Sequence, residues 1–256
     1  MSWSAKQYVA FEDERTRPVR DLLSAVPAGT MGRAIDLGCG PGNSTEVLAQ
    51  RFPQAEVSGI DSSEDMILAA RQRLPKLRFE VADVAEWRDP GPYDVILANA
   101  LFQWIPHHAT LFPALLRKLA PGGALAIQMP DNLEGAAHRL MRETAAQGPW
   151  AAKLANAAAA RATLEGADWY YDLLRPASSR VDIWRTTYYH SLTEGASGVV
   201  EWFKGSGLRP YLQPLDDSER ATYLERYTAA VARAYPARAD GSVLLPFPRL
   251  FMVAVR

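Results

Sequence analysis

The chain has 256 residues, 48% of them hydrophobic, with a formal net charge of −1 and 4 histidines. This length and composition suffice for a full core, and a charge near zero offers no general attraction to nucleic acid or to an anionic membrane. The single cysteine, Cys39, excludes an intramolecular disulfide and a cysteine-rich metal site, so we expect no metal. No apolar run reaches the ~20 residues that span a bilayer and the charged N-terminus is no signal peptide, so we expect a cytoplasmic protein.

Residues 1–28 mix aromatic and charged side chains ahead of the first expected strand. Apolar residues at helical spacing predict a helix between residues 13 and 24. The aromatic residues before it, which include Trp3 and Tyr8, have two interpretations. They form a hydrophobic staple for that helix, or they form a flap that closes over a ligand.

Strand-like and helical segments alternate between residues 29 and 130. The expected strands are at 33–38, 56–60, 77–82, 93–98 and 124–129, with helices between them. Such alternation is typical of a parallel sheet with helices on both faces, in which ligands bind at the carboxyl ends of the strands. The fold class is therefore α/β, with residues 29–130 as the ligand-binding core.

The regular alternation stops after residue 130. Residues 131–182 read as a helical cap, and residues 183–256 complete the sheet and add one more cap helix. The expected elements are helices at 133–142 and 150–164, a strand at 181–190, helices at 198–205 and 217–234, and a last strand at 251–255, after Pro246 and Pro248. We expect a single structural domain with a seven-stranded, mostly parallel sheet and a small helical cap.

One stretch joins an apolar strand to a helix through a glycine-rich turn, Asp36-Leu37-Gly38-Cys39-Gly40-Pro41-Gly42-Asn43. Gly38 and Gly40 permit a tight turn and let a ligand lie against bare backbone. The glycine spacing departs from the dinucleotide fingerprint, and Asp36 would repel a pyrophosphate but suits a ligand with an ammonium group. S-adenosylmethionine (SAM) is such a ligand. An NAD site and a tight turn without any ligand are the alternatives.

Two further acids end strands at positions suited to a nucleoside. Asp61 ends the second strand about twenty residues after the glycines, where a carboxylate accepts both ribose hydroxyls, with Ser62 beside it. Asp83 ends the third strand, where it can accept the adenine amino group while the Val84 amide meets the ring. Met66, in the next helix, has two interpretations, contact with adenine or ordinary core packing.

Several segments, in order and at matching spacings, resemble the class I SAM-dependent methyltransferases. The resemblance covers roughly residues 30–130 and rests on residues 36–42, Asp61, Ala82-Asp83, the strand at 93–100 and the turn at 119–123. It implies a Rossmann-like fold, SAM as methyl donor and S-adenosylhomocysteine as product. The expected cofactor-binding residues are Asp36, Gly38, Gly40, Gly42, Asn43, Asp61, Ser62, Met66, Asp83, Val84 and Asn99.

A narrower resemblance, to methyltransferases that esterify small polycarboxylic acids, covers nearly the whole chain. It rests on residues 3–8, 11–18, 101–106 and 207–212. It implies that a methyl ester forms on a carboxylate of a small-molecule acid, and it favours the flap for Trp3 and Tyr8. Nothing in the sequence sets the oligomeric state.

The loop after the fourth strand leaves the sheet where the methyl group should emerge, so Gln103, Trp104 and His107 are candidates to position the acceptor. A carboxylate is already ionised at neutral pH, so no catalytic base is required, and His107 is a donor to the acceptor or plain loop structure. Buried carboxylates need cations and donors, for which arginine is best suited. The substrate-binding candidates are Trp3, Tyr8, Tyr170, Tyr171, Arg180 and Arg209.

Other function classes stay open from the sequence. An NAD-dependent oxidoreductase would share the fold, and a non-catalytic SAM-binding regulator would keep the cofactor motifs. A methyltransferase for a neutral oxygen, nitrogen or carbon acceptor would need a general base. The natural candidates for that base are His107, His108, His138 and His190.

Overall fold

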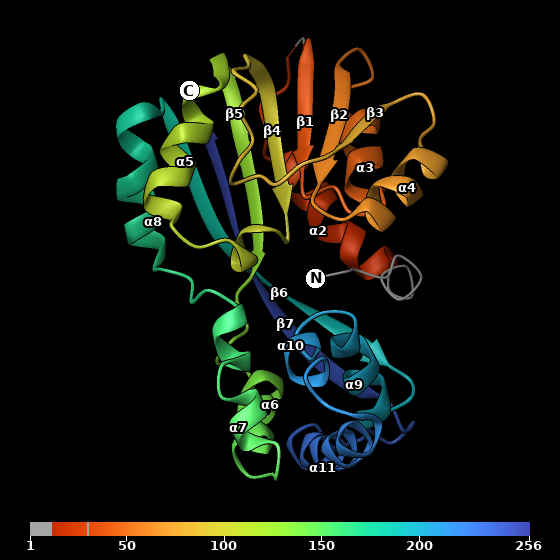
Figure 1. Ribbon diagram of the computed structural model, residues 1–256. Coiled ribbons are helices and arrows are strands. Elements are labelled where there is room, and N and C mark those ends of the chain that lie inside the picture. Colours follow the sequence, from red (N-terminus) through yellow and green to blue (C-terminus); the bar gives the residue numbers. More distant parts are fainter. Residues whose placement is uncertain (1–11, 30) are drawn as a thin grey trace. The chain divides into compact units, whose positions relative to one another are not determined.

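A seven-stranded sheet organises the structure, a computed structural model that describes residues 12–29 and 31–256. Trp3 and Tyr8 lie outside the described residues. The strands, in chain order, are β1 (Arg33–Leu37), β2 (Glu56–Asp61), β3 (Arg78–Val81), β4 (Tyr93–Asn99), β5 (Leu119–Pro130), β6 (Arg180–Leu192) and β7 (Val243–Val255). Their order across the sheet is β3-β2-β1-β4-β5-β7-β6 (Figure 1). The expected seven-stranded α/β fold is confirmed.

The first five strands pair in parallel. The chain moves outward from β1 through β2 to β3 and then returns to β4, on the other side of β1. This reversal sets the ends of β1 and β4 side by side, with Leu37 opposite Ala98. The carboxyl ends of strands at such a reversal form the crevice in which open α/β sheets bind ligands. We call this end of the sheet the binding edge.

β7 alone runs against the other strands. The Arg256 amide donates to the Gly123 carbonyl at 2.9 Å, so β7 ends where β5 begins. The Ser179 amide donates to the Val255 carbonyl at 2.8 Å, so β6 begins where β7 ends. The first residues of β6 therefore lie at the opposite end of the sheet from the binding edge.

Helices cover both faces of the sheet, as expected. On one face, α5 (His108–Arg117) and α8 (Ala167–Leu174) pack together, and their apolar side chains share a core cluster with Ile35 and Leu37 of β1. Asp36, between these two residues, points to the other face and contacts α3 (Asn43–Arg51). That face is also covered by α2 (Glu12–Ser24) and α4 (Glu64–Arg73) (Figure 1). The alternation along β1 thus gives each face its own helical layer.

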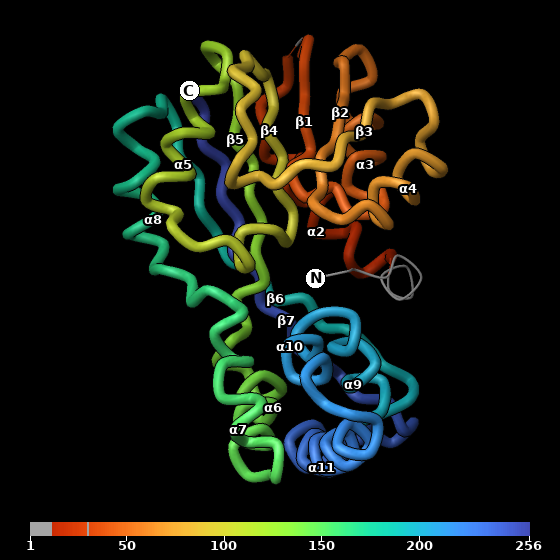
Figure 2. The backbone as a smooth tube through the Cα atoms, in the orientation of Figure 1, coloured from red at the N-terminus to blue at the C-terminus, as the bar shows by residue number. Residues whose placement is uncertain are grey.

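The contacts between residues divide the chain into two compact units. Unit 1 holds the described residues up to Pro130 together with Leu164–Thr186 and Leu250–Arg256. Unit 2 holds Asp131–Thr163 and Thr187–Arg249, which Figure 2 draws in green and in teal to blue. This division differs from the expected single domain with a cap over 131–182, because α8 and the start of β6 group with unit 1.

Unit 2 is mainly helical. Its helices are α6 (Ala136–Ala146), α7 (Ala151–Leu154), α9 (Ala196–Lys204), α10 (Arg209–Leu212) and α11 (Asp217–Ala234). Tyr223 and Tyr227, four residues apart on α11, donate hydroxyl hydrogen bonds to carbonyl oxygens of α6, at 3.0 Å to Met141 and 3.2 Å to Ala137. This spacing puts both tyrosines on one face of α11 and fastens it to α6. No helix of the described chain is long and apolar enough to cross a membrane.

The helix expected at 150–164 is largely absent. Only Ala151–Leu154 is α-helical, and Ala157–Ala160 forms a short 3-10 helix, labelled η2. Leu154 is the only buried residue of α7, and η2 has none. Alanine favours a helix intrinsically, but most helical stability in a protein comes from burying an apolar face, which this stretch lacks.

The last strand is longer than expected, because β7 starts at Val243 and continues through both prolines. Pro246 and Pro248 are two residues apart, so their missing N–H groups lie on the same side of the strand. Hydrogen bonds on the other side can continue past them. The expectation that the prolines precede the strand is wrong for this reason.

Candidate functional site

The glycine-rich turn begins at the binding edge, directly after β1. Gly38, Gly40 and Gly42 have positive φ angles of 66°, 54° and 91°, a conformation that residues with side chains rarely adopt. At Gly38 a Cβ would lie 2.7 Å from Leu101 Cδ1, so close packing requires glycine there. At Gly40 no atom of the described residues lies within 4 Å of the Cβ position. The backbone of Gly40 therefore has room beside it for a ligand.

Asp36 is completely buried beneath this turn, at 0% exposure. Its Oδ2 accepts hydrogen bonds from the hydroxyls of Ser44 and Thr45, both at 2.7 Å, in the first turn of α3. Burial raises the pKa of Asp36 to about 7, although the two hydroxyls act in the opposite direction. Asp36 thus fixes the helix that follows the turn.

Asp61 joins the end of β2 to the glycine turn. Its Oδ2 accepts a hydrogen bond from the Gly40 amide at 3.0 Å, and its Oδ1 accepts one from the Ser63 amide at 2.9 Å. Burial raises the pKa of Asp61, while both amides lower it. A carboxylate has about four acceptor positions, so two remain after these bonds. The two backbone amides hold Asp61 in one orientation, as recognition of a pair of ribose hydroxyls requires.

Three buried oxygen atoms near the ends of β1 and β4 lack a hydrogen-bond partner within residues 12–29 and 31–256. They are Asp36 Oδ1, Asn99 Oδ1 and Gln103 Oε1. The amide oxygens of Asn99 and Gln103 are acceptors, so the group that would satisfy them must be a donor, whereas Asp36 Oδ1 accepts only when that carboxyl group is ionised. The ammonium of SAM carries three N–H donors and a positive charge. These residues and the open space at Gly40 therefore fit SAM, and no set of three or more potential metal ligands occurs in the described chain.

The remaining predicted cofactor residues lie in different surroundings. Asn43 begins α3, is buried, and donates to Thr16 Oγ1 at 3.4 Å. Ser62 is exposed. Met66 is only 3% exposed, and its contact with adenine stays a prediction.

The turn after β3 has one exposed and one buried residue. Asp83 is exposed, and its Oδ1 accepts a hydrogen bond from the Ala85 amide at 2.8 Å, as a turn residue does. Val84 is buried in the core that α5 and α8 cover. The side chain of Asp83 and the Val84 amide stay predictions for adenine recognition.

The loop after β4 contains the 3-10 helix η1 (Phe102–Trp104) and ends at α5. Gln103 is 4% exposed and its Nε2 donates to the Ala100 carbonyl at 2.6 Å, while its Oε1 has no hydrogen-bond partner in the described residues. Trp104 is half-buried, and His107 is exposed with a φ of 66° at the N-terminus of α5. Gln103 is thus the loop residue that can take part in the binding edge, and His107 lies on the surface of the loop.

His108 is a structural residue. Its ring is 7% exposed, with Nδ1 2.8 Å from the Tyr170 hydroxyl and Nε2 2.9 Å from the Phe102 carbonyl. A carbonyl oxygen only accepts, so Nε2 carries a proton, and Nδ1 is hydrogen-bonded to the tyrosine hydroxyl. Tyr170 is itself 0% exposed and lies in the core, which corrects its assignment to the acceptor. Its neighbour Tyr171 is 45% exposed.

Comparison with known proteins decides between the function classes. A family model described as a methyltransferase domain matches residues 34–123. A trans-aconitate 2-methyltransferase of Methylobacterium nodulans is 56% identical over 99% of this chain and 98% of its own length. Another, of an Azoarcus species, is 54% identical over 100% of this chain and 99% of its own length. The chain belongs to the trans-aconitate 2-methyltransferase family. Membership confirms both resemblances and removes the NAD-dependent oxidoreductase.

Solved structures agree with the fold of this family member. The YcgJ protein of Bacillus subtilis matches with a TM-score of 0.60 at 10% identity, over 94% of this chain and 98% of its own. A Haemonchus contortus phosphoethanolamine N-methyltransferase, solved with SAM, matches with a TM-score of 0.54 at 18% identity, over 93% of this chain and 52% of its own. At such identities the likeness shows the fold alone, and it confirms the expected Rossmann-like core.

Arg180 lies far from the binding edge, which corrects its assignment to the acceptor. It opens β6 at the opposite end of the sheet, as the hydrogen bond of Ser179 to Val255 shows. Its guanidinium donates to the Ala25 carbonyl at 3.1 Å and lies 3.7 Å from the Asp182 carboxylate. Arg209 opens α10 in unit 2, where partial burial lowers its pKa.

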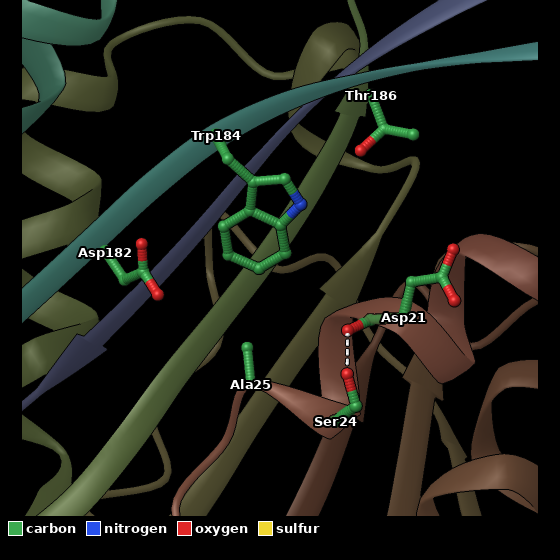
Figure 3. Close-up of a pocket in the computed structure, with 6 residues that line it drawn as sticks. All are labelled: Asp21, Ser24, Ala25, Asp182, Trp184 and Thr186. Carbon is green, nitrogen blue, oxygen red and sulfur yellow. Dashed lines mark hydrogen bonds between the residues drawn. The ribbon is translucent and has the colours of Figure 1, made fainter.

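A pocket of 460 Å³ lies between the end of α2 and β6 (Figure 3). Asp21 and Asp182 both contribute carboxylates to it, and Trp184 and Thr186 project from β6. Two carboxylates repel an anionic acid, and these residues lie outside the loops that follow β1, β2 and β4. This pocket therefore does not suit the acceptor of the family.

The sequence did not predict that Ser44 and Thr45 donate hydrogen bonds to Asp36. Ser44 and Thr45 stand eight and nine residues after Asp36 and hold its carboxylate from the first turn of α3. Adjacent hydroxyls directly after a glycine turn are the signal that points to this contact, because that turn folds the helix back over the strand end.

Proposed function

We propose that this chain transfers the methyl group of SAM to a carboxylate of trans-aconitate, giving the monomethyl ester and S-adenosylhomocysteine. The observation that carries the proposal is the 56% identity, over 99% of this chain, to a relative named for that activity. The resemblance carried by residues 3–8, 11–18, 101–106 and 207–212 implies the same class of acceptor.

The cofactor half of the proposal rests on the binding edge of unit 1. Asp61 accepts hydrogen bonds from the ribose hydroxyls, and SAM lies against the open backbone at Gly40. The side-chain oxygens of Asn99 and Gln103 accept hydrogen bonds from the ammonium group of SAM. When bound, SAM supplies an electrophilic methyl group on a sulfonium. The residues themselves orient it, and positioning of two reactants is worth up to roughly 7–11 kcal/mol of the barrier.

A carboxylate acceptor removes the need for a catalytic base. Its oxygen is ionised at neutral pH and attacks without losing a proton. Two of the four candidate histidines agree with this. The two nitrogens of His108 are engaged with Tyr170 and Phe102. Burial, followed by the charges of Arg161 and Arg142, lowers the pKa of His138 to about 3, so that ring is neutral. Neither ring is placed as the base that a neutral acceptor would need.

Charge disappears as the reaction proceeds, because an anion joins a sulfonium. A strong donor at the attacking oxygen would hold it in the ionic ground state and slow the transfer. We therefore propose that Gln103, Trp104 and His107 shape the loop around the reacting carboxylate and exclude water, without neutralising it. Recognition of the acid then belongs to cationic residues that grip its other carboxylates.

The acceptor is tested with the purified protein, SAM and a panel of acids that contains trans-aconitate, cis-aconitate, citrate and isocitrate, with products read by mass spectrometry. We expect a gain of one methyl group on trans-aconitate and little or none on the others. A panel without any methylated acid, from protein that still binds SAM, would remove the acceptor from the proposal and leave the cofactor.

The cofactor is tested by Asp61→Ala, with Asp65→Ala as control. Asp65 is an exposed acid in the first turn of α4, four residues farther along the chain. Loss of two charge-assisted hydrogen bonds to ribose should weaken binding of S-adenosylhomocysteine at least on the order of 100-fold. The control should bind as the unaltered protein does. Equal affinities of the two variants, measured by titration calorimetry, would rule out Asp61 as the ribose ligand.

A further inference from the structure

A cluster of cationic and aromatic side chains lies within unit 2. We call it the arginine cluster and define it by Arg142 of α6, Arg161 after η2 and Tyr211 of α10. The packing of α10 against η2 brings Arg161 and Tyr211 together. Burial raises the pKa of Tyr211, and the nearby charges of Arg142 and Arg161 act against it. Side chains from α6, from the segment after η2 and from α10 thus lie near one another.

Neutral groups hold the Arg161 guanidinium in place. Its Nη1 donates to Asn132 Oδ1 at 3.1 Å and lies 2.9 Å from His138 Nε2. A guanidinium has no acceptor, so His138 Nε2 must accept and its proton is on Nδ1. These two contacts orient Arg161, and the Asp131 carboxylate also acts on its charge.

His138 in turn is held rigidly. It is 4% exposed and lies edge-on to Phe203 at 5.1 Å between ring centres. A Cβ at Gly207 would come within 2.5 Å of its Cε1, so only glycine lets the backbone before α10 lie this close to the ring. A buried neutral histidine that supports an arginine is a typical second layer behind a charged binding residue.

Arg142 stands four residues after His138 on the same face of α6. Its Nη1 donates to the Leu133 carbonyl at 2.8 Å, and its Nη2 is 3.7 Å from Glu134, a side chain that is 94% exposed. The negative charges that face the cluster are Glu134 and Asp131, and Asp131 raises the pKa of Arg161. Asp131 and Glu134 balance the two arginines in charge, so what the cluster offers a carboxylate is the paired N–H donors of its guanidinium groups.

We propose that the arginine cluster recognises carboxylates of the polycarboxylic acid, with Arg142 and Arg161 as its cationic ligands and Tyr211 as a hydroxyl donor. This inference rests on the proposed function and names the residues that give it specificity. The planar fork of arginine meets a carboxylate through two parallel hydrogen bonds, which a single surface lysine cannot do. Neither Arg142 nor Arg161 belongs to a motif that the sequence marks.

The test uses the full chain with Arg161→Gln, Arg142→Gln and Tyr211→Phe, and Arg139→Gln as the matched control. Arg139 lies on the same helix, is exposed, and pairs with Glu143 at 2.9 Å. Each arginine variant should raise the KM for trans-aconitate on the order of 10- to 100-fold, since a hydrogen bond to a charged group is lost. The affinity for S-adenosylhomocysteine should stay unchanged in every variant. Tyr211→Phe removes one oxygen atom only, so it reports on the cluster even where an arginine variant fails to fold.

Calorimetric binding of trans-aconitate to the protein loaded with S-adenosylhomocysteine separates this inference from the proposed function. An unaltered protein that methylates the acid, with variants that show its KM and affinity unchanged, would overturn the arginine cluster and leave the reaction. An unaltered protein that binds the acid without methylating it, with binding lost in Arg161→Gln and Tyr211→Phe, would support the cluster and overturn the reaction. Absence of both binding and methylation in the unaltered protein would overturn both.

Discussion

At the scale of single residues, Gly40 is the position where a side chain would occupy the space that the ligand needs. Its φ of 54° strains any residue with a side chain, but its Cβ position is open. Gly122 offers a matched comparison, with a φ of 79° and no atom of the described residues within 4 Å of its Cβ position.

We expect Gly40→Ala and Gly122→Ala to lose similar stability, about 1–2 kcal/mol each, because both place alanine in the left-handed region. Only Gly40→Ala should lose affinity for S-adenosylhomocysteine, since its methyl group fills the space that the ligand needs. Urea unfolding and titration calorimetry measure the two effects separately. If both variants bind the ligand equally well, the ligand does not lie on Gly40.

Asp36 gives the fold a dependence on pH. Its pKa is about 7 in the folded protein and about 3.9 in an unfolded chain. Between these values the folded state holds a proton that the unfolded state has lost, so the free energy of unfolding decreases as the pH rises. The stabilisation is complete below about pH 4 and is lost by the time the pH has passed about 7, at a cost of up to about 4 kcal/mol.

Asp36→Asn should remove this dependence, because an amide does not ionise but still offers an oxygen to Ser44 and Thr45. From pH 5 to pH 8 the unfolding free energy of the unaltered protein should therefore decrease relative to that of the variant. Urea unfolding without cofactor at the two pH values measures it. Parallel pH profiles of the two proteins would show that Asp36 is ionised throughout.

Single residues also show where sequence reasoning ends. Asp61 and the glycines could be assigned because a motif fixes both their type and their place at a strand end. Tyr170 could not, since neighbouring residues of a helix differ in burial by the face they occupy, and Tyr170 is buried while Tyr171 is exposed. Arg180 was misassigned because its place depends on the direction of β6, which only the partner strands determine.

At the scale of elements, α11 stabilises unit 2 through its tyrosine face. Tyr223 is 0% exposed and its hydroxyl donates to the Met141 carbonyl of α6. Tyr223→Phe should lower the free energy of unfolding by about 1 kcal/mol, because a buried hydrogen bond is lost while the ring still fills its space. Tyr189→Phe is the control, since Tyr189 is 63% exposed. Equal urea midpoints for the two variants would contradict this role of α11.

The elements of the core were easier to predict than those of unit 2. Apolar strand patterns predicted β1 to β4 within about one residue of their observed ends, although the helix expected between β3 and β4 is absent from the described chain. The helix predicted at 150–164 was wrong because an alanine-rich composition indicates only intrinsic helix propensity. In α7 only Leu154 is buried, so there is little packing to stabilise a longer helix. The prolines of β7 misled because the sequence does not tell which side of a strand its N–H groups face.

At the scale of the whole molecule, the sheet order and the family agree on one function. The reversal between β1 and β4 creates a binding edge, and the acids, glycines and unpartnered oxygens at that edge suit SAM. The family was recognisable from motifs in sequence order. The division into two units was not, because each of the two segments of unit 2 continues without interruption from a strand of the sheet.

Transfer of a methyl group to a carboxylate is most directly tested by the chemical fate of that group. The purified protein is incubated with trans-aconitate and SAM labelled in its methyl group, and the label in the acid product is counted before and after treatment with alkali. An ester releases its methyl group as methanol under alkali, whereas a methyl group on carbon or nitrogen stays. We predict label in the acid in a 1:1 ratio with S-adenosylhomocysteine and its full release as methanol. An acid without label, or a label that resists alkali, would contradict the proposed function.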